Sequence, residues 1–391
     1  MACSTPITGR AAVLSAVERA TGRVFGADGE ALELSRGSDR PLGPRDAIER
    51  SVARALERTP CAVSFSGGLD SSTVLAVAVK VARARGLPEP VPVTLRFPGV
   101  ADARETDWQE LVIAQLGVKD WERVELAGEI DLLGELACAG LREHGLLWPA
   151  NAHAHVPVFE RARGGSVLTG LDGDGLFGGW RWQRAQAVLQ RQTWPRPRDV
   201  PRVALALAPP SWRRTRMRSA LAPDLEWITE PEREPIIRAV LDDAGATQPR
   251  RWAARVAWYA RRRYLSVGLH SLDLLAADRE VQITHPLADR AFLTALARDG
   301  GPAGYGTRRQ AMSSLFSDLL PPALLERTTK AVFDQPLWGS SARAFAASWN
   351  GEGLDRSLID VDALRAHWQL ATPTLWSATV LQDAWLAAQA R

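Results

Sequence analysis

The fold is decided by the stretch Ala62–Val79, which reads AVSFSGGLDSSTVLAVAV. A short apolar run stops at Ser66-Gly67-Gly68, and an apolar stripe typical of a helix follows Asp70. A buried strand, a glycine turn and a helix in this order are typical of an open α/β sheet. Ligands bind such sheets beyond the carboxyl ends of the strands, so this turn lies where a site is expected.

The alternation of strands and helices continues to about residue 185. A βαβα order of this kind predicts an α/β fold, with a parallel sheet and flanking helices. Beyond that point helical periodicity dominates, broken by proline-rich turns. We therefore predict a short N-terminal helical segment (1–60), an α/β core (61–185) and a mostly helical C-terminal domain (186–391). The expected strands are 61–65, 91–97, 121–126 and 165–170, and the expected helices between them are 71–86, 105–117 and 130–145.

Composition narrows the class of protein. The chain has 391 residues and a net charge of +3, with no apolar run long enough to cross a bilayer and no secretory signal at its N-terminus. Its three cysteines have no metal-like spacing, which fits a reducing cytoplasm. Arginines cluster beside tryptophans, as in WRRTRMR (Trp212–Arg218). Two interpretations stay open: the surface binds a nucleic acid, a peptide or a phosphate, or it is a solvated helix face without a partner.

The glycine turn has the chemistry of a phosphate site. Free amides at a helix N-terminus and serine hydroxyls bind anions. The lysine of the common phosphate loop is missing, and Asp70 stands where phosphate oxygens would approach. A carboxylate beside phosphate requires a bridging cation, and Mg²⁺ is the usual one. The segment LDGDGLFGG supplies a second carboxylate, Asp174 or Asp172, at the end of the fourth predicted strand.

These two motifs resemble those of the asparagine synthetase family, in which S-G-G-x-D-S-S and G-x-G-x-D-E-x-F-G-G-Y close two strands. Here they read SGGLDSS and GLDGDGLFGGW. Two downstream segments, DLLAADREVQITHPLADRAFLTAL and LLPPALLERTTKAVFDQPLWG, are also similar to the family, so the resemblance covers about residues 48–391. It implies a synthetase domain of the PP-loop ATP pyrophosphatase type. ATP would adenylate a carboxylate, and an amine would displace AMP.

The resemblance also implies roles for individual residues. Lys330 matches the family lysine that stabilises charge during adenylation or amide formation, and Asp70 and Asp174 would bind Mg²⁺. Phe65, Leu95 and Gly170 would contact the adenosine through the strand-end backbone. The β- and γ-phosphates of ATP, which leave as pyrophosphate, would be held by Ser66, Gly67, Gly68, Asp70, Ser71 and Ser72.

Departures from the family pattern change the expected product. Leu171 stands where the family has an acid that assists the amine, and the neighbouring Asp172 is the candidate replacement. Only about sixty residues precede the turn, so we expect no glutaminase domain. The missing acid puts a plain asparagine synthetase in doubt, and the chain resembles instead a branch like the β-lactam synthetases and lasso-peptide macrocyclases. The stretch RTTKAVFDQPLWG and the tail LRAHW…LQDAWLA are most similar to the macrocyclases. The expected substrate is a small molecule or peptide carrying a carboxylate and an amine, with a leader-peptide-binding or protease partner.

Three alternatives remain at this stage. The first is an ammonia-using, asparagine synthetase-like enzyme. The second is a tRNA-modifying PP-loop enzyme, and the third is a scaffold that kept the fold without the activity. Nucleic acid is disfavoured because the catalytic cysteine pair or zinc site of the tRNA enzymes is missing. His153 and His155 are close in sequence but have no identifiable third metal ligand, so we interpret them as cleft-lining or packing residues.

Overall fold

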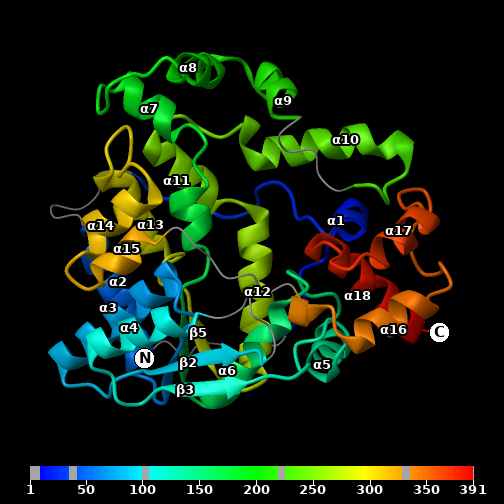
Figure 1. The fold of residues 1–391 in the computed structure, drawn as a ribbon, viewed down its shortest axis with the longest axis horizontal. Helices are drawn as coiled ribbons and strands as arrows, with labels where there is room; N and C mark the ends of the chain where they lie inside the picture. The colour runs from blue at the N-terminus through cyan, green and yellow to red at the C-terminus, as the bar shows by residue number, and fades with distance from the viewer. Residues whose placement is uncertain (1–8, 35–41, 99–104, 219–224, 328–334, 391) are drawn as a thin grey trace.

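The computed structural model describes residues 9–34, 42–98, 105–218, 225–327 and 335–390. Its centre is a five-stranded sheet in the order β3-β2-β1-β4-β5, in which every pair of neighbours is parallel. The first four strands confirm the predicted ones (Figure 1). The strands are β1 (Cys61–Ser64), β2 (Val91–Arg96), β3 (Glu122–Glu125), β4 (Ser166–Thr169) and β5 (Gln282–Thr284).

Helices cover both faces of this sheet because successive strand residues point to opposite sides. Val63 of β1 packs in the core with α2 (Pro44–Leu56) and α3 (Leu69–Arg85). Ala62, one residue earlier, packs in a different core with residues of α6 (Val156–Arg161) and α12 (Arg263–Ala277). The predicted parallel sheet with flanking helices is confirmed.

The helices between the strands lie close to where the sequence places them. Gly86 and Gly117 end α3 and α4 (Thr106–Leu116) in the left-handed conformation expected of a C-cap glycine. The third helix is shorter than predicted, since residues 130–134 form turns before it. The remaining helices of this half are α1 (Ala16–Thr21), α4 (Thr106–Leu116) and α5 (Glu135–His144).

The C-terminal half is mostly helical, as predicted, but it also completes the sheet. β5 was not predicted, because a three-residue strand offers too little alternation to be distinguished from a loop. The boundary at residue 185 stays a prediction. The helices are α7 (Gln183–Leu189), α8 (Asp199–Leu207), α9 (Pro210–Arg218), α10 (Glu230–Leu241), α11 (Trp252–Ala260), α13 (Arg290–Asp299), α14 (Arg308–Phe316), α15 (Pro322–Glu326), α16 (Ser340–Ser348), α17 (Val361–Trp368) and α18 (Leu375–Gln389). Within the described ranges, no helix combines the length and apolarity that a membrane span needs.

Candidate functional site

The serine–glycine turn joins β1 to α3 at the carboxyl end of the sheet. Gly67 has φ +85°, a conformation that glycine adopts without strain, and Gly68 is the N-cap of α3. The Gly68 amide donates to Ser66 Oγ at 3.3 Å, and Ser71 Oγ donates to the Gly68 carbonyl at 3.1 Å. Ser66 Oγ and Ser71 Oγ are 3.1 Å apart. The turn therefore gathers hydroxyls at the positive end of a 17-residue helix.

The second glycine–aspartate turn follows β4, which is the direct neighbour of β1, and it packs against the first turn. A Cβ on Gly170 would lie 2.5 Å from the Ser71 amide nitrogen. A Cβ on Gly173 would lie 2.3 Å from the Asp70 carboxyl group. A larger residue at position 170 would push the two turns apart, because it would meet backbone atoms, whereas one at position 173 would displace the Asp70 carboxyl group.

We expect the substitution Gly170→Ala to separate the two turns. The atom that its Cβ meets belongs to the backbone of α3 and cannot rotate away, so the free energy of unfolding should fall by about 2 kcal/mol. Affinity for ATP should fall with it. Chemical denaturation and calorimetric titration measure the two effects.

The matched control is Gly268→Ala, in α12. There the nearest atom to the new Cβ is Trp148 Cζ3 at 3.5 Å, an ordinary van der Waals distance. Alanine favours a helix interior, so this variant should be as stable as the parent or more stable by up to about 1 kcal/mol. Equal behaviour of the two variants would contradict the close contact between the turns.

Arg308, at the start of α14, connects the two predicted metal ligands. Its guanidinium donates to Asp70 Oδ2 at 2.7 Å and pairs with Asp174 Oδ1 at 2.9 Å. The two carboxylates are thus close enough to share one cation. Arg308 was not predicted, because nothing in the sequence distinguishes it from the many other arginines.

The two carboxylates fit a magnesium ion. A positive group already lies between Asp70 and Asp174, and Gly173 leaves room beside the Asp70 carboxyl. No cluster of three or more His, Cys, Asp or Glu side chains suited to a metal occurs in the part of the chain that the structure describes. Mg²⁺ needs only one or two carboxylates together with phosphate oxygens.

Asp172 lies between these turns and α11, in an unusual conformation. Its φ is +68°, and the Tyr259 hydroxyl donates to its backbone carbonyl at 3.2 Å. Burial raises the pKa of its carboxyl group to about 6, and Asp174 and Asp70 also raise it. A hydrogen bond from Tyr259 and the charge of Arg255 oppose that rise. A carboxylate with this pKa can accept a proton near neutral pH.

Glu105 and Arg327 form a buried ion pair on the other side of the serine–glycine turn. The Arg327 guanidinium also donates to the Gly67 carbonyl at 3.4 Å and lies over the Trp108 ring at 5.1 Å from its centroid. The turn therefore contacts Arg327, which is the residue directly before the segment 328–334. Lys330, the predicted catalytic lysine, lies in that segment, outside the described residues.

We expect Glu105→Ala to lower the free energy of unfolding by about 3 kcal/mol, because it removes the buried carboxylate that pairs with Arg327. The double variant with Arg327→Ala should lose less than the sum of the two single losses. The exposed pair Arg309–Glu326 provides the control, and Glu326→Ala should cost under about 1 kcal/mol. Additive losses at residues 105 and 327 would show that the pair is not coupled.

The two turns line a cavity of about 320 Å³. Phe65 and Leu95 are not among its lining residues, and the Phe65 side chain is buried in the core, so their contact with adenosine stays a prediction. Gly67 belongs to the turn without lining the cavity, and Ser72 is buried in α3 behind it. The predicted residues that do line it are Ser66, Gly68, Asp70, Ser71, Gly170, Asp172 and Asp174.

The same cavity contains residues that the sequence did not single out, such as Thr169, Leu324 and Arg308. His155 also lines it, and burial lowers the pKa of its imidazole to about 4. His153 is buried, and its two ring nitrogens lie at 3.1 and 2.9 Å from backbone carbonyls. The interpretation of this pair as cleft-lining and packing residues is confirmed.

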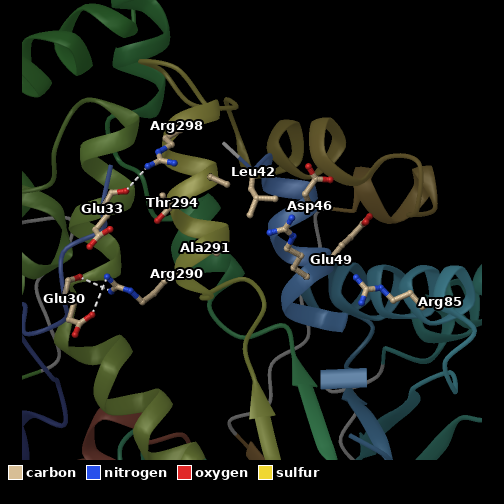
Figure 2. Close-up of a pocket in the computed structure, with 12 residues that line it drawn as sticks. Glu30, Glu33, Leu42, Asp46, Glu49, Arg85, Arg290, Ala291, Thr294 and Arg298 are labelled. Atoms are coloured by element: carbon tan, nitrogen blue, oxygen red, sulfur yellow. Dashed lines mark hydrogen bonds and ion pairs between the residues drawn. The ribbon is translucent and has the colours of Figure 1, made fainter. Parts of the chain in front are cut away.

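A larger cavity of about 1140 Å³ lies elsewhere, between the N-terminal segment, α2 and α13 (Figure 2). Its walls are mostly charged, and Arg290 and Arg298 donate to backbone carbonyls of Glu30 and Glu33. It contains neither glycine turn, so the smaller cavity is the candidate site.

The comparisons agree with this choice. The chain matches the protein-family model described as asparagine synthase over residues 43–388. The matched range includes both glycine turns, Arg308 and the Glu105–Arg327 pair. No curated protein matches the chain.

Proposed function

Because the chain belongs to the asparagine synthase family, which indicates an ATP-dependent ligase-type enzyme, we propose that it forms an amide bond by adenylating a carboxylate. A carboxylate oxygen attacks the α-phosphorus of ATP, and pyrophosphate leaves. An amine nitrogen then attacks the acyl carbon, loses a proton, and displaces AMP. The observation that carries the proposal is that Asp70 and Asp174 share one cation beside the N-terminus of α3.

The serine–glycine turn is the pyrophosphate site in this proposal. The hydroxyls of Ser66 and Ser71 and the free amides that begin α3 face negatively charged oxygens. Asp70 and Asp174 would hold Mg²⁺, which neutralises phosphate charge and supplies electrostatic stabilisation to the leaving group. Arg308 pairs with both carboxylates and would add a second positive charge to the phosphate site.

Asp172 is the proposed base for the second half of the reaction. It lines the same cavity as the metal carboxylates, and its raised pKa allows it to take the proton of the attacking amine. Leu171, beside it, adds an apolar wall where a polar catalytic group would otherwise stand. Holding both reactants in one cavity supplies part of the rate by proximity.

We further propose that both reacting groups belong to one substrate, so that the product is a macrolactam of the kind made in natural-product biosynthesis. The support is the resemblance of the motifs to the macrocyclase branch and the replacement of the family acid by Leu171 and Asp172. A partner that delivers a peptide substrate fits this proposal.

The test is exchange of radiolabelled pyrophosphate into ATP, with a panel of carboxylates and of linear peptides that carry a free amine. Exchange that depends on substrate, together with AMP formation, is the expected result. Formation of ADP and phosphate would contradict adenylation. For the macrolactam, mass spectrometry should show the loss of one water from a peptide; incorporation of ¹⁵N from ammonium would instead assign an ammonia-using amidation.

A further inference from the structure

The segment that runs from α7 to α9 carries apolar side chains that face solvent. Trp194 is 90% exposed, Val200 69%, Leu207 53% and Trp212 71%. These four come from residues 194–212, whereas the other large exposed apolar side chains of the described chain, Leu189 apart, lie on distant segments. In Figure 1 the three helices form the outer edge of the molecule opposite the strands. We call Trp194, Val200, Leu207 and Trp212 the apolar edge.

Helix α8 has a second apolar face besides the one that packs on the core, where Val203 and Leu205 are partly buried. Val200, Ala204 and Leu207 lie at spacings of four and three and are all exposed, so they form one apolar face toward solvent. Asp199 and Ala206 are buried on an adjacent side of the helix, where Asp199 pairs with Arg184. The apolar face is therefore left without a covering element among the described residues.

Positive charge surrounds this edge. Residues 183–218 contain nine arginines and a single acid, Asp199. Arg196 and Arg198 lie between Trp194 and α8, and Arg216 lies one turn after Trp212 in α9. These three arginines are exposed, and none makes an ion pair with any described acidic residue. The partner of the apolar edge therefore has negative charge beside apolar groups.

The shape of the edge distinguishes between partners with that chemistry. A bound peptide occupies a groove, and the one cavity described beside α9, of about 320 Å³, is lined by Arg214, Arg218, Glu234 and other residues that exclude the apolar edge. Side chains that project this far from the surface insert one by one into a fluid apolar medium and need no groove. A bilayer interface is such a medium, and tryptophan, aliphatic residues and arginine are the residues that bind it.

We propose that the apolar edge and its arginines dock the protein on an anionic membrane surface. Trp194, Val200, Leu207 and Trp212 enter the boundary between headgroups and acyl chains, and Arg196, Arg198 and Arg216 contact lipid phosphates. The docking is peripheral and reversible. It is independent of the proposed reaction, because none of these residues lines the candidate site.

The test is co-sedimentation of the full chain with vesicles of phosphatidylcholine alone or mixed with phosphatidylglycerol. The wild type should bind the mixed vesicles at least ten-fold more tightly than the neutral ones, and high salt should weaken that binding. The variant Trp194→Ser/Leu207→Ser/Trp212→Ser should lose at least ten-fold in affinity. Its circular dichroism and its substrate-dependent turnover in free solution should be unchanged.

The matched control is Val13→Ser/Leu370→Ser, which removes exposed apolar side chains outside the edge and should bind like the wild type. Failure of the wild type to bind mixed vesicles would overturn the proposal, and so would equal binding by the edge variant. Suppose that the wild type does not bind vesicles, and that the edge variant instead loses self-association in sedimentation velocity, or loses binding to RNA or to an acidic peptide. The apolar edge would then be assigned to that partner.

Discussion

Replacing Asp70 or Asp174 by asparagine will reduce substrate-dependent pyrophosphate release by about 10³-fold, which corresponds to about 4 kcal/mol of transition-state stabilisation. In the structure both carboxylates pair with the guanidinium group of Arg308. An amide keeps the size of the side chain and removes the charge that would hold Mg²⁺ against phosphate oxygens. The measurement is the initial rate of release as a function of the Mg²⁺ concentration.

Two control variants separate this role from simple pairing with Arg308. Asp362→Asn removes an acid that is almost fully exposed and should leave the rate unchanged. Arg308→Ala should raise the KM for ATP without raising the Mg²⁺ requirement, because it removes a cation and not a metal ligand. If Arg308→Ala shifted the Mg²⁺ requirement as much as the aspartate variants, the assignment of the metal ligands would be wrong.

The second large effect is expected at Asp172. The pKa of this carboxyl group is raised to about 6, and the group accepts a proton only when it is ionised. The ionised fraction of Asp172 falls about ten-fold per pH unit below pH 6, so the rate of amide formation should show an inflection near this pH. Asp172→Asn should lower the rate by about 10²–10⁴-fold and remove this inflection, while pyrophosphate exchange in the first half-reaction continues.

The neighbouring titratable groups do not produce the same inflection. Burial lowers the pKa of His155 in the same cavity to about 4, so its imidazole is neutral over this range. Asp273 also has its pKa raised to about 6 by burial, but it does not line the cavity, so Asp273→Asn is the matched control and should keep the profile. An inflection that survived in Asp172→Asn would assign the proton transfer to another group.

A further variant, Asp172→Gly, separates charge from backbone strain. The φ of +68° at this position is easier for glycine than for aspartate. The glycine variant should be as stable as the parent or more stable, and as slow in amide formation as the asparagine variant. Recovery of the rate in Asp172→Gly would show that the aspartate acts through the backbone alone.

Much of the site follows from local sequence patterns. An apolar run, two glycines and a helical stripe predict β1, the turn and α3, and a second glycine–aspartate turn follows β4. Parallel strands end at the same edge of a sheet, so two such turns are expected to lie close to one another. The structure agrees, because Gly173 in the second turn lies against the carboxyl group of Asp70 in the first.

The charged residues that complete the site could not be predicted in this way. Arg308 is 238 residues from Asp70, and Arg327 is 222 residues from Glu105. Neither pair produces a periodic pattern in the sequence. The apolar and polar residues around each arginine reflect the packing of its own helix or loop, and they do not indicate a distant partner. β5 was missed for a related reason, since its three residues pair with β4 across more than a hundred intervening residues.

The sequence by itself determined the α/β class, the two glycine turns and the position of an aspartate in each, because these depend on neighbours within a few residues. Only the tertiary structure decided that Arg308 joins Asp70 to Asp174, that Glu105 and Arg327 fix the serine–glycine turn, and that the face of α8 is turned outward. Those features depend on which distant segments meet. The physical reason is that a charge or an apolar face acquires its role from what lies opposite it in space.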